Sequence, residues 1–196
     1  MAEGNHRVMT AWGFLAVRLP EEDAEWMGYR VSILKALGVL DPAGQPTARL
    51  EVVKAGNVAR LTKEAFDTER NAAMRICEQC HTPNFVAENF KNADLMLKEI
   101  DKVFAEAIEI VADLYRAGII VDENRPGAEY PDLLEFYDAG TKVETLLYEM
   151  FMDHRMKAFQ GTFHINPDYA TWYGYAKMKK GLTEIREVAA KMKADK

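Results

Sequence analysis

Both cysteines of the chain lie in one five-residue segment, Cys77-Glu78-Gln79-Cys80-His81. A C-x-x-C-H sequence is the pattern to which c-type haem is covalently attached. Two thiols three positions apart reach the two vinyl groups of one porphyrin, and the adjacent imidazole becomes the first axial ligand of the iron. We therefore predict one covalent haem c per chain, attached through Cys77 and Cys80, with His81 as a metal ligand.

Three other interpretations of this segment stay open. It is a chance pattern at a helix end, a thioredoxin-like redox pair, or half of a zinc site. A redox pair is expected beside a βαβ unit, and the sequence has no such pattern. A zinc site needs two further ligands from a chain with four histidines. The haem interpretation is therefore favoured.

Length and charge indicate what kind of domain carries the motif. The 196 residues suit a single domain, 1–196, with a sizeable core. The formal net charge of -6 offers no basic surface for nucleic acid or for an anionic membrane. No apolar run approaches the roughly 18 residues that span a bilayer, so we expect no membrane span.

The N-terminal stretch from Ala11 to Val17 is apolar but short, and it lacks a small-residue cleavage site. We therefore expect no signal peptide within this sequence. Because haem is attached to C-x-x-C-H motifs outside the cytoplasmic membrane in bacteria, we still expect a periplasmic or other extracytoplasmic location.

Helical periodicity covers almost the whole chain, and we predict an all-α fold of long antiparallel helices around the haem. The first helix is expected to start at Pro20, with acidic residues 21–23 in its first turn, and to end at Gly38. The turn-rich segment 41–47 is the one candidate for an internal boundary. A second helix should begin near Thr62 and run into the haem motif.

A long third helix is expected after Pro83. Its apolar stripe runs from Leu95 to Tyr115, and Gly118 should end it. A loop over 122–130 follows.

A fourth helix should open at Pro131 and double back along the third, with an apolar stripe that ends in His154. The residue types of Asn166-Pro167-Asp168 are typical of a helix start, and this last helix should run towards Lys193.

For the second axial ligand of the iron, the residues alone leave several candidates. The candidates are His164, His154, His6 and the ten methionines, and an open position is the remaining alternative. At about 1.5 Å per residue, His164 should lie level with His81, and His154 two to three turns further along the fourth helix. His154 continues an apolar stripe, where a histidine is more commonly a core residue. We favour His164 as the second metal ligand, with His154 next.

Three stretches of the sequence occur together with this motif. They are Trp12 to Pro20, Cys77 to His81 with the long helix after it, and His154 to Tyr169 with Trp172-Tyr173-Gly174. Together they resemble the C-terminal part of the octahaem hydroxylamine oxidoreductase family, which is related to the multihaem cytochrome c nitrite reductases. In those enzymes a histidine near the end of a C-terminal helix ligates the last haem, and Gly161-x-x-His164-x-x-Pro167 is similar to that segment.

The resemblance also shows a difference, because members of the family carry several C-x-x-C-H motifs and this chain has one. It implies a terminal electron-transfer haem without the catalytic haem. Some members cross-link a tyrosine of this region to the haem of a neighbouring subunit in a trimer. Tyr169, Tyr173 and Tyr175 lie in the matching stretch, where packing is the simpler role.

The function expected from these observations is one-electron transfer. Two axial imidazoles leave no position for a substrate, so we do not expect catalysis by this chain alone. The expected partners are a redox protein or other multihaem subunits, and a homo-oligomer, with a trimer implied by the resemblance. Two alternatives stay open: a catalytic open-site haem that acts on hydroxylamine or nitrite, and a helical assembly module without haem.

Overall fold

The structure is a computed structural model that describes residues 19–55, 62–135 and 139–195. Within these ranges every regular element is a helix, which confirms the all-α expectation. The elements are α2 (Ala24–Ala36), α3 (Ala48–Ala55), α4 (Lys63–Cys77), α5 (Pro83–Arg116), α6 (Lys142–Glu149), the π-helix η2 (Met150–Arg155), α7 (Met156–Phe163), the π-helix η3 (Tyr169–Tyr175) and α8 (Ala176–Ala194). None of these helices is both long enough and apolar enough to cross a membrane.

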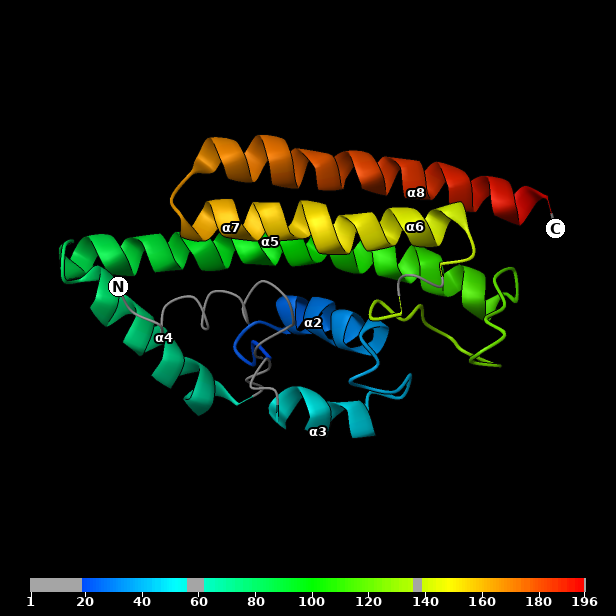
Figure 1. The fold of residues 1–196 in the computed structure, drawn as a ribbon, viewed down its shortest axis with the longest axis horizontal. Helices are drawn as coiled ribbons and strands as arrows, with labels where there is room; N and C mark the ends of the chain where they lie inside the picture. Colours follow the sequence, from blue (N-terminus) through cyan, green and yellow to red (C-terminus); the bar gives the residue numbers. More distant parts are fainter. Residues whose placement is uncertain (1–18, 56–61, 136–138, 196) are drawn as a thin grey trace.

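The long helix α5 forms the axis of the molecule (Figure 1). The continuous helix α6-η2-α7 runs back along it, and η3-α8 returns alongside both, with α8 packed against α5 as well as against α6. On the opposite side of α5 lie α2 and α3, and α4 descends from its beginning. The core lies between these layers, where the rings of Phe104 and Phe151 stack with centroids 5.5 Å apart. As predicted, the end of α7 therefore lies near the beginning of α5.

A buried charged cluster joins the layers on both sides of α5. Asp101 is fully buried, and its carboxylate accepts a hydrogen bond from the Trp26 indole at 2.8 Å. It also pairs with Arg30 of α2 at 2.6 Å and with Arg155 of η2 at 3.1 Å. Because a buried charge is stable only when its partners are correctly placed, the cluster fixes α2 and η2 against one position of α5.

The first helix starts one turn later than predicted. Asp23 is its N-cap, and its carboxylate accepts a hydrogen bond from the Trp26 backbone N–H at 3.0 Å. The acidic residues 21–23 therefore precede the helix instead of filling its first turn. The predicted ends at Gly38 and Gly118 are confirmed, with φ angles of 65° and 61° that glycine adopts readily.

The predicted start of the fourth helix at Pro131 is wrong. That helix begins as α6 at Lys142, after a capping box in which Thr141 and Glu144 satisfy each other's backbone N–H groups. Residues 131–135 instead form turns, because Asp132 accepts a hydrogen bond from the Leu134 N–H at 2.9 Å and so competes with a helix.

Two further details differ from the expectations. The short helix α3 was not predicted. Leu95, expected in the apolar stripe of α5, is 59% exposed, so the buried stripe passes through Ala93 and Leu97 instead. His6 and most of the stretch Trp12 to Pro20 lie outside the described residues.

Candidate functional site

The C-x-x-C-H segment forms one tight turn between two helices. α4 ends at Cys77, whose carbonyl accepts hydrogen bonds from the backbone N–H groups of Cys80 and His81 at 3.1 and 3.0 Å. Thr82 then caps α5, and its hydroxyl accepts a hydrogen bond from the Phe85 N–H at 3.4 Å. This turn places the two free thiols one helical turn apart, with the imidazole directly after them.

An apolar pocket opens beside this turn and encloses about 530 Å³, counting the part open to solvent. Of the motif, Cys77 and His81 line the pocket, whereas Cys80 is exposed and lies outside its walls. The first turns of α5 supply Phe85, Val86, Asn89, Phe90 and Ala93. The end of α7 and the turn after it supply Thr162, Phe163 and Ile165.

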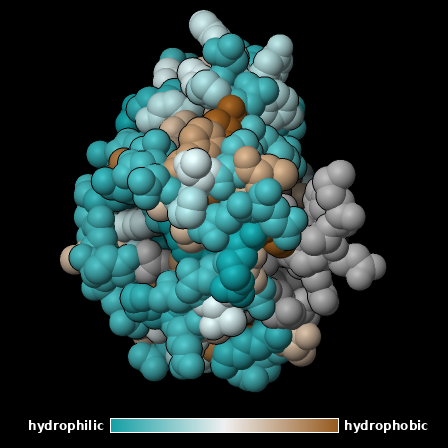
Figure 2. All heavy atoms as spheres, turned by 90° about the vertical axis from the view of Figure 1, so that its left-hand side faces the viewer, coloured by the Kyte–Doolittle hydropathy of each residue, from teal (hydrophilic) through white to brown (hydrophobic). Residues whose placement is uncertain are grey.

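Aromatic rings form much of the pocket wall. The His81 imidazole stacks on the Phe85 ring with centroids 4.9 Å apart, and Phe90 meets Phe163 edge-on at 6.0 Å. Phe85 is 43% exposed and Ile165 52%, so two large apolar side chains face an open space. Figure 2, which views this end of the molecule, shows apolar atoms gathered in the upper half of a mostly hydrophilic face. Apolar walls of this kind suit a flat aromatic macrocycle.

The helix that carries Cys77 is held against the pocket wall by Arg70. Its guanidinium donates two hydrogen bonds to Asp94 of α5, at 2.9 and 2.7 Å. The same guanidinium lies over the rings of Phe66 and Phe90, 5.8 and 5.1 Å from their centroids. This bidentate contact between Arg70 and Asp94 fixes the direction of α4 relative to α5.

The chemistry of Cys77 differs from that of a redox cysteine. Burial raises the pKa of the Cys77 thiol, whereas the attacking thiol of a redox pair has a lowered pKa. Within residues 19–55, 62–135 and 139–195, no three His, Cys, Asp or Glu side chains come together in a group suited to a metal ion. The thiol donors, the imidazole and the apolar walls together fit a covalently attached haem.

His164 lies at the same end of the molecule as His81. It is the C-cap of α7, and its backbone N–H donates to the Gln160 carbonyl at 2.9 Å. Its neighbours Phe163 and Ile165 line the pocket, but the His164 side chain is exposed and is not part of the walls. The structure therefore brings the His164 backbone to the pocket, and its role as a ligand stays a prediction.

His154 lies in η2, about 15 Å back along the same helix. Its Nε2 atom is 3.8 Å from a Glu149 carboxylate oxygen and 3.7 Å from one of Asp153. Its Nδ1 atom is buried and has no hydrogen-bond partner among the described residues. Burial lowers the pKa of His154. It is not part of the pocket walls, and its role as a ligand also stays a prediction.

The turn after His164 has an unusual backbone. The N–H of Asn166 donates to the Gly161 carbonyl at 2.8 Å, and that of Ile165 to the Thr162 carbonyl at 3.2 Å. This is the Schellman pattern that also ends α2 and α5, where glycine occupies the left-handed position. Here that position is Ile165, with a φ of 54°. A left-handed backbone costs a non-glycine residue about 1–2 kcal/mol.

After this turn, η3 begins where the sequence predicted a helix start. The Asn166 side chain accepts a hydrogen bond from the Tyr169 N–H at 3.0 Å. η3 packs closely on α7, since a Cβ atom at Gly174 would lie 2.3 Å from the Ala158 nitrogen. Its outer face exposes Trp172 by 68% and Tyr173 by 58%. Trp172 and Tyr173, which belong to the stretch that carries the resemblance, therefore lie on the surface.

No family model matches the chain, and no curated protein matches it in sequence. Its fold is similar to that of solved structures. One is a reducing HAO-like protein complex of Kuenenia stuttgartiensis, with a TM-score of 0.58 and 17% identity over 69% of this chain and 35% of that chain. Another is a hypothetical multiheme protein, with a TM-score of 0.56 and 17% identity over 80% of this chain and 26% of that chain.

The similarity in fold confirms the expected structural resemblance to proteins like hydroxylamine oxidoreductase. The chain spans 35% of the length of the first of these proteins and 26% of the second. The likeness therefore concerns one part of each of these larger proteins.

The sequence identified the motif but not the pocket around it. The apolar stripe predicted for the third helix begins at Leu95, although Val86, Phe90 and Ala93 continue the same helical spacing backwards to the motif. That spacing could have identified the α5 wall. Phe163 and Ile165 could not have been found in this way, because they join the pocket through the turn that follows α7.

Proposed function

We propose that this chain is a c-type cytochrome module that transfers single electrons. The observation that carries the proposal is that the C-x-x-C-H turn opens directly onto an apolar pocket, with Cys77 and His81 in its wall. Cys77 and Cys80 would hold the porphyrin through thioethers, and His81 would bind the iron. When bound, the haem supplies one-electron exchange between ferric and ferrous states.

The pocket residues have roles that follow from their chemistry. Phe85, Phe90 and Phe163 exclude water from the space beside the motif and lower its polarity. His164 is our proposed second axial ligand, because it is the histidine whose two chain neighbours line the pocket. With two imidazole ligands the iron would have no position for a substrate, which favours electron transfer over catalysis.

The chain is proposed to work with other proteins in an extracytoplasmic compartment. One structure of similar fold is described as a protein complex, which supports a redox partner or other multihaem subunits. The exposed Trp172 and Tyr173 support contact with further protein, and self-association as a trimer is the form that the sequence resemblance suggests.

Covalent haem attachment tests the proposal directly. The chain is produced in a host with cytochrome c maturation, and its mass is measured under denaturing conditions. We expect the mass of one haem to remain on the wild-type chain and to be absent from the Cys77→Ala/Cys80→Ala variant. A red protein that releases all its haem in acidic acetone would overturn the proposal.

The second ligand is tested by two matched histidine variants. His164→Ala should convert a low-spin absorption spectrum into a high-spin or ligand-accepting one, while the haem stays attached. His154→Ala should keep the low-spin spectrum, because His154 lies outside the pocket. The reverse result would assign the ligand to His154.

Turnover assays separate electron transfer from the catalytic alternative. The haem-bearing chain should exchange electrons with small redox dyes and show negligible hydroxylamine oxidation or nitrite reduction. Substantial turnover by a monodisperse monomer would contradict the electron-transfer assignment.

A further inference from the structure

We propose that Ile165 is a shielding residue of this pocket, held in a left-handed backbone conformation so that its side chain would keep water from a haem attached to Cys77 and Cys80. The inference rests on the proposed function, because the group to be covered is the haem of Cys77 and Cys80. It assigns to Ile165 a task that neither the motif nor the ligand histidines perform, which is the exclusion of water at the pocket mouth.

The first argument is the choice of residue in the turn. α2, α5 and α7 end with the same pair of backbone hydrogen bonds, and glycine takes the left-handed position at Gly38 and Gly118. In the described part of the chain, Ile165 is the one non-glycine residue with a positive φ. A β-branched side chain is among the least suited to that conformation. The presence of isoleucine at position 165 therefore has its reason in the side chain, because the backbone conformation by itself favours glycine.

The second argument is where that side chain lies. Ile165 is 52% exposed, so about half of its side chain is left uncovered by the chain itself. It nevertheless lines the pocket that Cys77 and His81 line. These two motif residues enter the pocket from the α4–α5 turn, whereas Ile165 enters from the turn after α7. An apolar group attached to the cysteines would bury the Ile165 side chain and compensate for the strain.

The consequence for electron transfer follows from polarity. A ferric haem carries one more positive charge than a ferrous haem, and water at its edge stabilises the more charged form. A side chain that excludes water therefore raises the reduction potential. Ile165 is thus expected to raise the reduction potential of the haem, whereas the motif cysteines would hold the porphyrin.

Four variants of the full chain, compared with the wild-type chain and all carrying covalent haem, test this inference. Ile165→Gly and Ile165→Asn suit the left-handed backbone but remove the apolar cover, whereas Ile165→Val keeps the cover. Val121→Gly is the control, because Val121 is an exposed apolar residue that is not part of the pocket wall. Spectroelectrochemistry should show a more negative midpoint potential for the glycine and asparagine variants, and an almost unchanged one for the valine variant and the control.

Thermal unfolding of the haem-free chain, made in the Cys77→Ala/Cys80→Ala background, supplies the second readout. In that background Ile165→Gly and Ile165→Asn should raise the melting temperature. Both substitutions relieve the backbone strain at position 165, and no haem is present for the isoleucine side chain to shield. Equal potentials in all haem-bearing variants, or a melting temperature that falls with both substitutions, would overturn the role of Ile165 alone. A wild-type chain that takes up no covalent haem would overturn the proposed function as well.

Discussion

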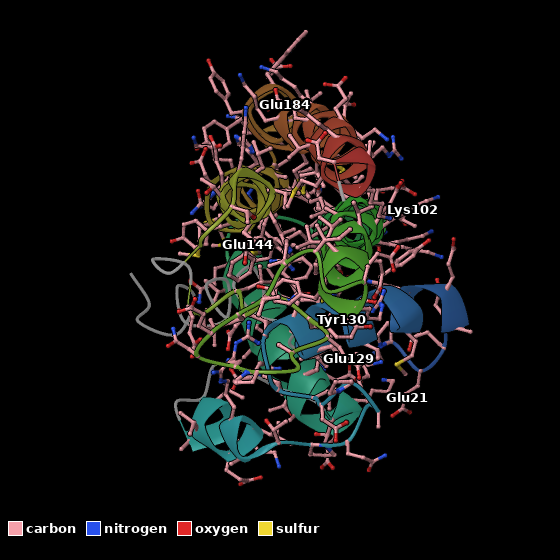
Figure 3. All side chains as sticks on the ribbon, turned by 90° about the vertical axis from the view of Figure 1, so that its right-hand side faces the viewer. Glu21, Lys102, Glu129, Tyr130, Glu144 and Glu184 are labelled. Carbon is pink, nitrogen blue, oxygen red and sulfur yellow. The ribbon has the colours of Figure 1, made fainter. Side chains whose placement is uncertain are left out.

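The two ends of α5 have different surroundings: polar side chains hydrogen-bond to each other around the C-terminal end, whereas an open apolar pocket adjoins the N-terminal end. At its C-terminal end the Tyr115 hydroxyl donates to Glu144 of α6 at 2.6 Å, and Tyr130 donates to Glu109 at 3.2 Å. Figure 3 views this end, with Tyr130 beside α5 and Glu144 between α6 and α5. Glycine at position 118 ends the helix without strain. At this end, side chains of the chain itself therefore supply the hydrogen-bond partners of Tyr115 and Tyr130.

The N-terminal end of α5 has the opposite character. Phe85 and Ile165 are half-exposed around an open apolar pocket, and Ile165 holds a strained backbone. About half of each of these two side chains is left open to solvent. The difference supports the proposed function, in which the C-terminal end of α5 is complete after folding and the N-terminal end would be completed by the haem.

The most direct test of this contrast is the change in local stability on haem attachment. Amide hydrogen exchange of the haem-bearing chain, compared with the Cys77→Ala/Cys80→Ala variant, should show slower exchange in α4 and residues 161–175. We expect a change of at least about tenfold there, or about 1.4 kcal/mol, and little change near Gly118. Uniform protection along α5 would contradict the contrast between its ends.

The packing of η3 on α7 should tolerate no added atom. In Gly174→Ala the new methyl would lie 2.3 Å from the Ala158 nitrogen, so the helices must separate. We expect the free energy of unfolding to fall by roughly 3 kcal/mol in chemical denaturation. The matched control is Gly28→Ala, where a Cβ meets nothing within 4 Å, and it should add about 0.5–1 kcal/mol.

The contact between α4 and α5 should contribute less. Arg70→Met removes two charged hydrogen bonds to Asp94, and the free energy of unfolding should fall by about 2 kcal/mol in urea titrations. The comparable substitution Lys63→Met removes an exposed pair with Asp67 and should change it by less than about 0.5 kcal/mol. Equal effects would show that the haem-motif helix is not anchored by Arg70.

Substitutions at Gly118 and at Ile165 should change the free energy of unfolding in opposite directions. Gly118→Ala introduces a Cβ at a φ of 61° and should lower the free energy of unfolding by about 1–2 kcal/mol. Ile165→Gly, in the haem-free chain, should raise it. Differential scanning calorimetry of both variants measures the two shifts, and a loss of stability in both would remove the contrast.

The smallest expected effect is an alkaline one at the far end. Burial and the hydrogen bond to Glu144 raise the pKa of Tyr115. The protonated phenol therefore stabilises the fold below its unfolded pKa of about 10, and this contribution is lost as the pH rises towards the folded value. Tyr115→Phe should flatten the decline in unfolding free energy above about pH 9, by less than about 1 kcal/mol. A decline of unchanged slope would place the alkaline sensitivity elsewhere.

The sequence by itself determined the helical fold, most helix ends and the attachment motif, because each depends on local chemistry. Helical periodicity, the caps at Thr62 and Asn166, and the glycines at 38 and 118 act within a few residues. Local residue types misled twice. Pro20 and the acidic residues after it suit a first helical turn, but Asp23 is the N-cap of α2. Pro131 suits a helix start, but Asp132 holds that segment in a turn.

Only the tertiary structure decided what surrounds the motif. Phe163 and Ile165 reach the pocket because α6-η2-α7 folds back along α5, and no local pattern records how far such a return extends. The buried cluster of Asp101, Arg30 and Arg155 sets that register through contacts between distant segments. Such contacts depend on which side chains meet after the chain has folded, so the pocket could be found only in the assembled molecule.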